Sequence, residues 1–446
     1  MTRVIIIGGG ISGLASAWFL SSGGHDVRVL EAGAAPGGCL QTRAENGFLL
    51  DTGPTSTLYR GGGLGQLIRG VGLDGQLVEA NEVARNRFIV KNGELIALPM
   101  SPVAFLGTSL FSARAKLRML LEPFKGRARH EETVAQFVTR RLGPEFLDWA
   151  IDPFVSGVYA GDPNKLSARA ATAKVYALEA ESGSLFIGAL ARAFQGKAGG
   201  PQPKGKLISF RAGMQSLAVK IADALGDKVL LDTEVTELEQ HSGTWLVRSR
   251  EREFTGDALV LAVPAYRAAE LLASFDAEVA HELEGVYYPP VASVALGFNR
   301  AQIRHPLDGF GMLIPRKMQC STLGVLFSST LFPGRATDGD VLLTAFVGGA
   351  RNPDIANSES EPLIEKTLDE LRPLLGIEGS AYYRRLTMWT RAIPQYELGH
   401  LERVARIDKA IQRFPSLYLR ANWRDGISVS DCTENACKLA SMPFFR

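Results

Sequence analysis

Apolar and polar positions at the start of the chain follow the pattern of a strand, a turn, a helix and a second strand. Residues 3–7 are a β-branched apolar run, residues 8–13 form a glycine-rich turn, and residues 14–22 repeat apolar positions with helical spacing. The sequence "DVRVLEA" at residues 26–32 has the composition of another strand. Together these elements predict one βαβ unit.

The pattern changes to helices between residues 100 and 200. Three stretches repeat apolar residues at intervals of three and four: "SARAKLRMLLEPF" (112–124), "EETVAQFVTRRLGPEFLDWAIDPF" (131–154) and "SLFIGALARAF" (184–194). The following segment, "QGKAGGPQPKGK" (195–206), is rich in Gly, Pro and Lys, so we expect a linker there.

Strand patterns return after this segment and continue to the last sixty or so residues, which also contain a terminal helix. The predicted strands lie in 228–238, 244–249, 258–264, 290–298, 322–329, 341–349 and 416–423. The order α/β, helical, β-rich and again α/β-like predicts a nucleotide domain that is assembled from separated pieces of the chain, with other domains inserted into it.

We therefore predict an α/β protein, α+β overall, with three domains, as its length also favours. The expected divisions are a Rossmann-like nucleotide-binding domain over 1–79, 205–265 and 391–446, a β-rich substrate domain over 80–99 and 266–390, and a helical insert over 100–204.

Charge and cysteine content exclude several kinds of partner. Lys and Arg total 49 against 47 for Asp and Glu in 446 residues, a balance that argues against nucleic acid. The cysteines show no metal-ligand spacing and the histidines are scattered, so we expect no metal site and a reducing, cytoplasmic compartment. We expect no signal peptide, and no apolar run approaches the roughly 18 residues that span a bilayer.

The glycine-rich turn has the spacing of a dinucleotide-binding motif. Gly8 permits the tight turn, Gly10 lets the backbone approach a pyrophosphate, and Gly13 lets helix and strand pack closely. The helix N-terminus then offers unpaired N–H groups to phosphates. Glu31 ends the second strand, where a carboxylate accepts hydrogen bonds from ribose hydroxyls and repels a 2′-phosphate. This pattern favours a nucleotide over an ordinary glycine turn and disfavours NADP, but it does not separate NAD from FAD.

The next segment, "AGAAPGGCLQTRAENGFLLDTGPTS" (32–56), resembles flavoproteins of the amine oxidase and phytoene desaturase superfamily. The resemblance implies non-covalent FAD. Amine oxidases commonly carry an Arg where Cys39 stands, and we interpret Cys39 as a small buried apolar residue. The contacts expected with FAD in this part of the chain come from Gly8, Gly9, Gly10, Ile11, Ser12, Gly13, Glu31, Ala32, Cys39, Gly53, Pro54, Thr55 and Ser56.

Longer stretches resemble one branch of that superfamily, the protoporphyrinogen oxidase family. They are "GVYAGDPNKLSARA" (157–170), "FSSTLFPGRA" (327–336), "FVGGARNP" (346–353), "IPQYELGH" (393–400) and "SVSDC" (428–432). The resemblance implies oxidation of protoporphyrinogen IX to protoporphyrin IX in haem or chlorophyll synthesis, with six electrons passing in three flavin cycles. Oxygen would be reduced to peroxide, and a quinone acceptor stays open.

Other functions on the same architecture stay open at this point. Coproporphyrinogen III, with four propionates, would call for more cations around the pocket. Amine or carotenoid oxidation uses related folds. Prenyl-protein chaperones also resemble this architecture, but they lack the flavin motifs that this chain keeps.

The resemblance also implies substrate contacts. Arg87, in the context "NRF", matches the family's propionate-binding Arg, and an Arg fork suits a carboxylate. Asn92 and Gly93 predict a hairpin turn, with Arg85 and Arg87 on one face of the incoming strand. Leu313, Phe332 and the backbone of Gly157 match positions beside the tetrapyrrole, although core packing and a helix stop explain these three residues equally well.

Further FAD contacts are expected from the second half of the chain. Val235 matches a backbone contact to the adenine, and Trp389 with Ile427, Ser428 and Val429 matches positions near the isoalloxazine. A further contact is expected from Asn422, which lies in the segment "RANWRDGIS" (420–428), where this chain departs from the small residues of the family pattern.

The helical insert carries an apolar stretch followed by Arg114, Lys116, Arg118, Lys125, Arg127 and Arg129. This pattern fits a segment on the headgroup layer of a membrane and equally a core helix with a solvated basic face. From the resemblance we expect a peripheral protein on the inner face of the cytoplasmic membrane. A homodimer and transfer of the product to a metal chelatase are further hypotheses.

Overall fold

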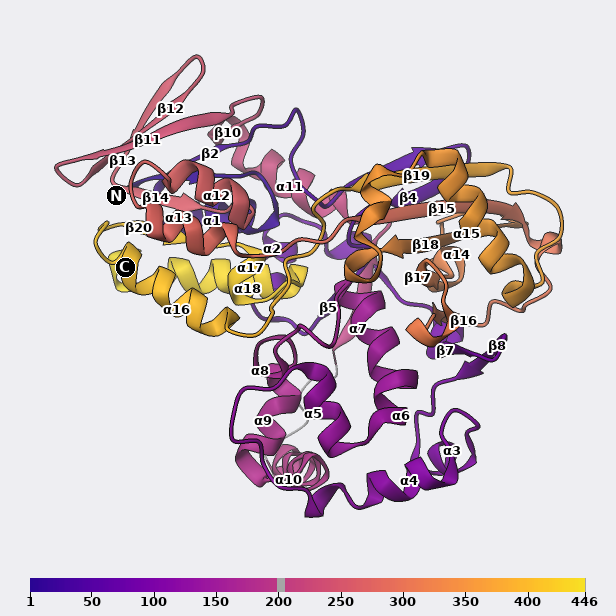
Figure 1. The fold of residues 1–446 in the computed structure, drawn as a ribbon. Coiled ribbons are helices and arrows are strands. Elements are labelled where there is room, and N and C mark those ends of the chain that lie inside the picture. The colour runs from indigo at the N-terminus through magenta and orange to yellow at the C-terminus, as the bar shows by residue number, and fades with distance from the viewer. Residues whose placement is uncertain (199–204, 446) are drawn as a thin grey trace.

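The computed structural model describes residues 1–198 and 205–445. Figure 1 shows three groups of elements: one built around the N-terminal strand, one around a large sheet, and one of helices. The middle of the predicted linker, residues 199–204, lies outside the described residues, and residues 195–198 belong to the last helix of the insert.

The first group contains a five-stranded parallel sheet in the order β10-β2-β1-β14-β20. Its strands are β1 (Arg3–Ile7), β2 (Asp26–Leu30), β10 (Val229–Leu230), β14 (Ala258–Leu261) and β20 (Leu417–Leu419). Because the five strands come from distant parts of the chain, this sheet is assembled from separated segments.

The central strand β1 is buried on both faces. Val4 and Ile6 pack in one hydrophobic cluster, and Ile5 and Ile7 pack in another. A parallel strand covered on both sides reads as a continuous apolar run. The first cluster includes α1 (Ile11–Ser22), α2 (Gly62–Gly70), α11 (Gln215–Leu225) and α18 (Val429–Ala440). The second includes β11 (Val235–His241), β12 (Thr244–Ser249), α12 (Ala265–Leu272), α13 (Ala277–Glu284) and α16 (His400–Ile411), and β13 (Glu253–Gly256) pairs with β12.

The second group is a seven-stranded sheet in the order β19-β15-β18-β17-β16-β7-β8. All neighbours are antiparallel except β16 and β7. Helix α15 (Ser360–Leu375) contributes to the core on one face. The strands are β7 (Asn86–Lys91), β8 (Glu94–Ala97), β15 (Val291–Asn299), β16 (Gly309–Leu313), β17 (Thr322–Leu326), β18 (Asp340–Gly348) and β19 (Tyr383–Trp389).

Short strands join the two groups. The hairpin of β3 (Thr42–Glu45) and β4 (Phe48–Asp51) packs through Phe48 and Leu50 against the large sheet. A three-stranded sheet pairs β9 with both β5 and β6. The bounds of these three strands are Thr57–Tyr59 for β5, Leu77–Glu79 for β6 and Lys206–Phe210 for β9.

The third group is the helical insert, whose helices have small cores of their own. Arg141 is fully buried and pairs with Glu122 at 3.0 Å and with Glu179. In the described part of the chain no helix is long and apolar enough to cross a membrane. The helices are α3 (Pro102–Gly107), α4 (Ala113–Leu120), α5 (Val134–Arg141), α6 (Pro144–Phe146), α7 (Asp152–Tyr159), α8 (Ala168–Ala171), α9 (Ala173–Ser182) and α10 (Leu185–Ala198).

The structure differs from the sequence prediction at several points. Helices α12 and α13 lie almost wholly within residues 266–390, which we assigned to the substrate domain, and they pack on the parallel sheet. The strand expected over 228–238 is broken between β10 and β11, where Asp232 has a φ of 51°. The turn at Asn92 and Gly93, with φ of 53° and 82°, closes the predicted hairpin.

Candidate functional site

The turn after β1 uses its glycines for two different purposes. A Cβ at Gly13 would lie 1.9 Å from the carbonyl oxygen of Gly8, so this glycine allows helix and strand to touch. Gly8 has a φ of 107°, which favours glycine. A Cβ at Gly10 would meet nothing within 4 Å, so this position faces open space. Gly10 is therefore where a phosphate group can approach the backbone.

Glu31 lies beside this turn and fixes its backbone. Its carboxylate accepts hydrogen bonds from the N–H of Gly9 at 2.5 Å and of Gly33 at 2.8 Å. Glu31 also lines the cavity that starts at the turn. The predicted acidic residue is therefore at the end of β2, where a ribose would lie.

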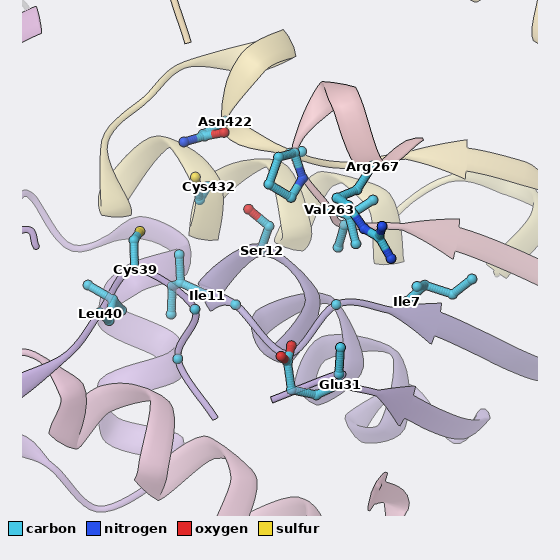
Figure 2. A pocket seen from close by; sticks show the side chains of 18 of the residues that line it. Ile7, Ile11, Ser12, Glu31, Cys39, Leu40, Val263, Arg267, Asn422 and Cys432 are labelled. Carbon is cyan, nitrogen blue, oxygen red and sulfur yellow. The ribbon is translucent and has the colours of Figure 1, made fainter. Parts of the chain in front are cut away.

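The cavity has a volume of about 380 Å³ and its walls come from segments far apart in the sequence. Figure 2 shows Ser12 near its middle, Cys39, Asn422 and Cys432 toward one end, and Arg267 toward the other. The predicted cofactor residues that line it are Gly8, Gly10, Ile11, Ser12, Glu31, Ala32, Cys39, Pro54, Val235, Trp389, Asn422, Ile427 and Val429.

The other predicted cofactor residues do not line this cavity. Gly53 packs against Cys39, since a Cβ there would lie 2.0 Å from the Cys39 carbonyl oxygen. Ser428 caps α18 by accepting a hydrogen bond from the Asp431 amide. Thr55 lines a small cavity next to the buried ion pair between Asp51 and Arg335. Gly9, Gly13 and Ser56 are also outside the lining set.

Sequence patterns missed several residues of the cavity wall. Arg267 is one, and its guanidinium is paired with Glu234 at 3.1 Å and with Glu270. Arg391 is another, with its guanidinium carbon 4.4 Å from the centre of the Tyr266 ring. None of these residues belongs to a recurrent motif. The other missed residues include Thr233, Ala262, Val263, Pro264, Tyr288, Ala392, Ala421 and Cys432.

The two cysteines of the wall differ in environment. Cys39 is exposed to the cavity, so our interpretation of it as a buried residue is wrong. Its position directly after two glycines with positive φ turns it toward the open space. Cys432 is buried, and burial raises the pKa of its thiol to about 12. Its thiol therefore stays protonated at neutral pH.

Trp389 connects the large sheet to the cavity. It is the last residue of β19, and its indole N–H donates to the carbonyl oxygen of Thr52 at 2.9 Å. Because Thr52 precedes the predicted segment Gly53 to Ser56, this bond holds that segment against the sheet.

The four predicted substrate residues form two neighbouring pairs outside the cavity. Gly157 on α7 contacts Leu313 on β16, since a Cβ at residue 157 would lie 2.3 Å from Leu313 Cδ2. Arg87 lies with its guanidinium carbon 5.3 Å from the centre of the Phe310 ring. Phe332 is 2% exposed and packs in a cluster that includes Phe310. Phe310 thus links Arg87 to Phe332.

Arg87 and Arg85 have different surroundings, which corrects our expectation that they share one face of a strand. Arg85 ends a 3-10 turn before β7 and pairs with Glu82 at 2.9 Å. Arg87 belongs to β7, is exposed, and pairs with no carboxylate of the described residues. The structure therefore leaves the Arg87 guanidinium free for an external anion.

The residues of the cavity fit FAD. The close-packed Gly13, the open face of Gly10 and the carboxylate of Glu31 match the requirements of a dinucleotide's pyrophosphate and ribose. The walls continue beyond this end to Trp389, Asn422 and Ile427, which leaves room for more than a mononucleotide. In residues 1–198 and 205–445, no group of three or more His, Cys, Asp or Glu side chains is placed to hold a metal ion.

Fold and cavity together define a dinucleotide-binding protein. The chain belongs to the flavin containing amine oxidoreductase family, which it matches over residues 11–419. It is therefore an oxidoreductase that uses FAD. The family resemblance seen in the sequence is confirmed.

Individual relatives show which members of this family the chain is similar to. Protoporphyrinogen oxidase 2, chloroplastic/mitochondrial, of Arabidopsis thaliana is 31% identical over 99% of this chain and 93% of its own. Coproporphyrinogen III oxidase of Bacillus subtilis (strain 168) is 28% identical over 97% of this chain and 96% of its own. A crystal structure from Exiguobacterium sp. 255-15, provisionally named a protoporphyrinogen oxidase, superposes with a TM-score of 0.84 at 25% identity, over 99% of this chain and 98% of that one.

Proposed function

We propose that this protein oxidises protoporphyrinogen IX to protoporphyrin IX in haem or chlorophyll synthesis. The names of its relatives in plants support a porphyrinogen substrate. The observation that carries the proposal is Arg87, an exposed guanidinium without a carboxylate partner among the described residues, beside the aromatic ring of Phe310. A free cation next to an apolar ring suits an apolar macrocycle that bears carboxylates.

FAD, when bound, would accept a hydride, which carries two electrons, from a carbon of the substrate, and three such cycles would remove six electrons. The side chains of the protein bind and orient the substrate. Arg87 binds a propionate, and Leu313, packed on Gly157, forms an apolar wall against which the macrocycle lies. Oxygen is the proposed acceptor, giving hydrogen peroxide, and peroxide formed per porphyrin in air tests this part against a quinone acceptor.

Coproporphyrinogen III is the second candidate substrate, and the relative in Bacillus subtilis favours it. The two porphyrinogens differ in their number of carboxylates, so cations around the substrate decide between them. The experiment is a side-by-side assay of both porphyrinogens with the FAD-loaded protein, following porphyrin fluorescence. Faster turnover of protoporphyrinogen IX supports the proposal. Faster turnover of coproporphyrinogen III overturns the choice of substrate, and bleaching of the flavin by neither compound overturns porphyrinogen oxidation.

We also propose that the helical insert rests on the surface of a membrane. Most large apolar side chains that are exposed in the described residues lie between Met100 and Phe194, and Phe124 is 84% exposed. Exposed apolar groups of this density mark a lipid or protein contact. Arg114, Arg127 and Arg129 are exposed and form no ion pair with the described carboxylates, so they are free for anionic headgroups.

We propose two further interactions of this protein, one with a metal chelatase and one with a second copy of the chain. A porphyrin released into solution is phototoxic, so we propose that the product is transferred to a metal chelatase. We also propose that the protein assembles as a homodimer. Native size measurement combined with a pull-down of chelatase tests both, and a monomer that binds no chelatase contradicts them.

A further inference from the structure

The segment "IPQYELGH" (393–400) connects the large sheet to α16. Its Tyr396 does not line the cofactor cavity but hydrogen-bonds to a turn that does. The hydroxyl of Tyr396 donates to the carbonyl oxygen of Asn422 at 2.5 Å and accepts from the amide of Gly426 at 2.9 Å. These two partners are the first residue of α17 (Asn422–Asp425) and the residue after its end. One hydroxyl therefore fixes both ends of this short turn.

The turn that Tyr396 holds is part of the cavity wall. Asn422 and Ile427 line the cavity on either side of it. Gly426 has a φ of 121°, and a Cβ there would lie 2.7 Å from the Cβ of Asp431, so the backbone has little freedom at this point. A change in the position of either end of the turn therefore moves residues that face the bound cofactor.

The ring of Tyr396 is itself held in place. It stacks on the imidazole of His400 with 4.2 Å between the ring centres and 10° between the planes. His400 is 3% exposed, so the stack lies in the protein interior. Burial lowers the pKa of His400 to about 4, so this stack is uncharged at neutral pH.

The same segment is anchored on its other side to the helical insert. The amide of Gln395 donates from Nε2 to the carbonyl oxygen of Tyr159 at 2.8 Å, and the N–H of Ser167 donates to the carbonyl oxygen of Tyr396 at 2.8 Å. Tyr159 ends α7, the helix that carries Gly157. The hydroxyl of Tyr396 is therefore supported from the insert and aimed at the turn beside the cofactor.

We propose that Tyr396 is a positioning residue for FAD, whose hydroxyl sets the distance between Asn422 and Gly426 and thereby shapes the cavity wall. The proposal rests on the FAD site and not on the proposed substrate. Titration with FAD alone therefore tests it, whatever the result of the porphyrinogen assay.

The experiment compares Tyr396→Phe with Tyr383→Phe. The first substitution keeps the ring stacked on His400 but leaves Asn422 and Gly426 without their shared partner. The second removes the hydroxyl bonded to Glu45 at 3.1 Å, at the opposite end of β19 from Trp389. For each protein the affinity for FAD, the absorption spectrum of bound flavin and the thermal unfolding of the FAD-free chain are measured.

We expect the Kd of Tyr396→Phe for FAD to be about tenfold higher, which corresponds to a loss of about 1.4 kcal/mol of binding free energy. We also expect the absorption spectrum of the bound flavin to be shifted. Tyr383→Phe is expected to bind FAD as the original chain does. An unchanged affinity and spectrum in Tyr396→Phe overturn the proposal, and so does an equal loss in both variants. If FAD-free Tyr396→Phe does not accumulate in folded form, both variants are purified with FAD present, and the flavin spectrum and the rate of FAD release on dilution are compared. A spectrum and a release rate equal to those of Tyr383→Phe overturn the proposal, and faster release from Tyr396→Phe with a shifted spectrum supports it.

Discussion

Gly157 and Leu313 meet across the boundary between the helical insert and the large sheet. A Cβ at residue 157 would lie 2.3 Å from Leu313 Cδ2, closer than any side chain tolerates. Gly324, on the strand next to that of Leu313, is also tight, with a Cβ there 3.0 Å from the same atom. Leu313 is thus confined by glycines on two elements, and its position depends on both.

We predict that Gly157→Ala displaces Leu313 and impairs substrate binding. Overpacking of this kind costs about 1–3 kcal/mol. The expected result is a KM for porphyrinogen raised by about tenfold or more, with FAD affinity unchanged, because neither residue lines the cofactor cavity. Steady-state kinetics and FAD titration measure the two effects. A lowered FAD affinity with unchanged KM would contradict the prediction.

Arg87 is the residue on which the proposed substrate contact depends. Charge-assisted hydrogen bonds contribute about 1.5–3 kcal/mol, so Arg87→Ala should raise KM by about 10- to 100-fold and change kcat less. Arg87→Lys should recover part of this loss, since it keeps the charge without the fork.

A matched control for Arg87 is Arg85→Ala, two residues earlier. The Arg85 guanidinium is exposed and already pairs with Glu82. Arg85→Ala should leave KM within about twofold, as is usual for surface ion pairs. Equal effects of the two alanine variants would show that Arg87 has no special contact with substrate.

The glycines of the first turn should respond differently to the same substitution. Gly13→Ala forces a Cβ to within 1.9 Å of the Gly8 carbonyl oxygen. The free energy of unfolding of the FAD-free chain should therefore fall by about 3 kcal/mol, and the chain should unfold at a lower temperature. Gly10→Ala adds its methyl group to open space inside the cavity, so folding should be preserved and FAD affinity should fall by about tenfold or more. Thermal unfolding and FAD titration of both variants check this contrast. Normal FAD affinity in Gly10→Ala would mean that phosphate does not approach this residue.

Glu179 gives the insert a stability that depends on pH. Burial opposes its ionisation, but hydrogen bonds from Arg140 and Arg141 outweigh burial and lower the pKa of Glu179 below 4.5. A group with a lowered pKa in the folded state stabilises the fold above its unfolded pKa, and this contribution is lost as the pH falls below that value. Glu179→Gln should therefore reduce the free energy of unfolding by about 3–5 kcal/mol near neutral pH, and by less below about pH 4.

The control for Glu179 is Glu181→Gln, on the same helix α9, which breaks an exposed ion pair with Arg192 of α10. It should cost less than about 1 kcal/mol at either pH. Urea unfolding of both variants at two pH values measures the difference. A cost of Glu179→Gln that is the same at both pH values would contradict the role of ionised Glu179.

The exposed apolar surface of the insert predicts binding to anionic vesicles. Replacing Phe124, 84% exposed, and Val103, 80% exposed, by Ser should weaken co-sedimentation with anionic phospholipid vesicles by about tenfold or more, since each buried side chain contributes about 1.5–3 kcal/mol. Tyr382→Ser, which removes a side chain 55% exposed directly before β19 of the large sheet, should have no effect. Equal vesicle binding by the original chain, the variant changed at Phe124 and Val103, and Tyr382→Ser would indicate that this surface binds another protein and not lipid.

Features with a fixed local spacing could be predicted from the sequence. The glycine turn, Glu31 and the hairpin at Asn92 and Gly93 depend on neighbours a few residues apart, so their geometry is written in a short stretch. Contacts between distant segments could not be read in this way. Helices α12 and α13 have apolar faces that fit either sheet, and only the tertiary structure decides between them.

The same limit applies to the site. Arg391 and Tyr266 line the cavity, but each comes from a segment whose pattern gives no sign of a ligand. Arg85 and Arg87 alternate in the sequence as in a strand, but β7 begins only at Asn86 and leaves Arg85 in the preceding turn. Tyr396, which holds α17, could be identified in the sequence only as part of a family motif. Its hydrogen bonds to Asn422 and Gly426 could not be predicted.

The order of strands in the parallel sheet has a consequence for biosynthesis. The edge of β14 is covered by β20, whose residues Leu417–Leu419 are synthesised after every strand of the large sheet. Until then the nascent chain carries an open strand edge next to an unfilled apolar layer, a state prone to aggregation. Translation that stops between residues 389 and 417 should therefore release a product that needs a chaperone or is degraded, even though the whole large sheet has already been made.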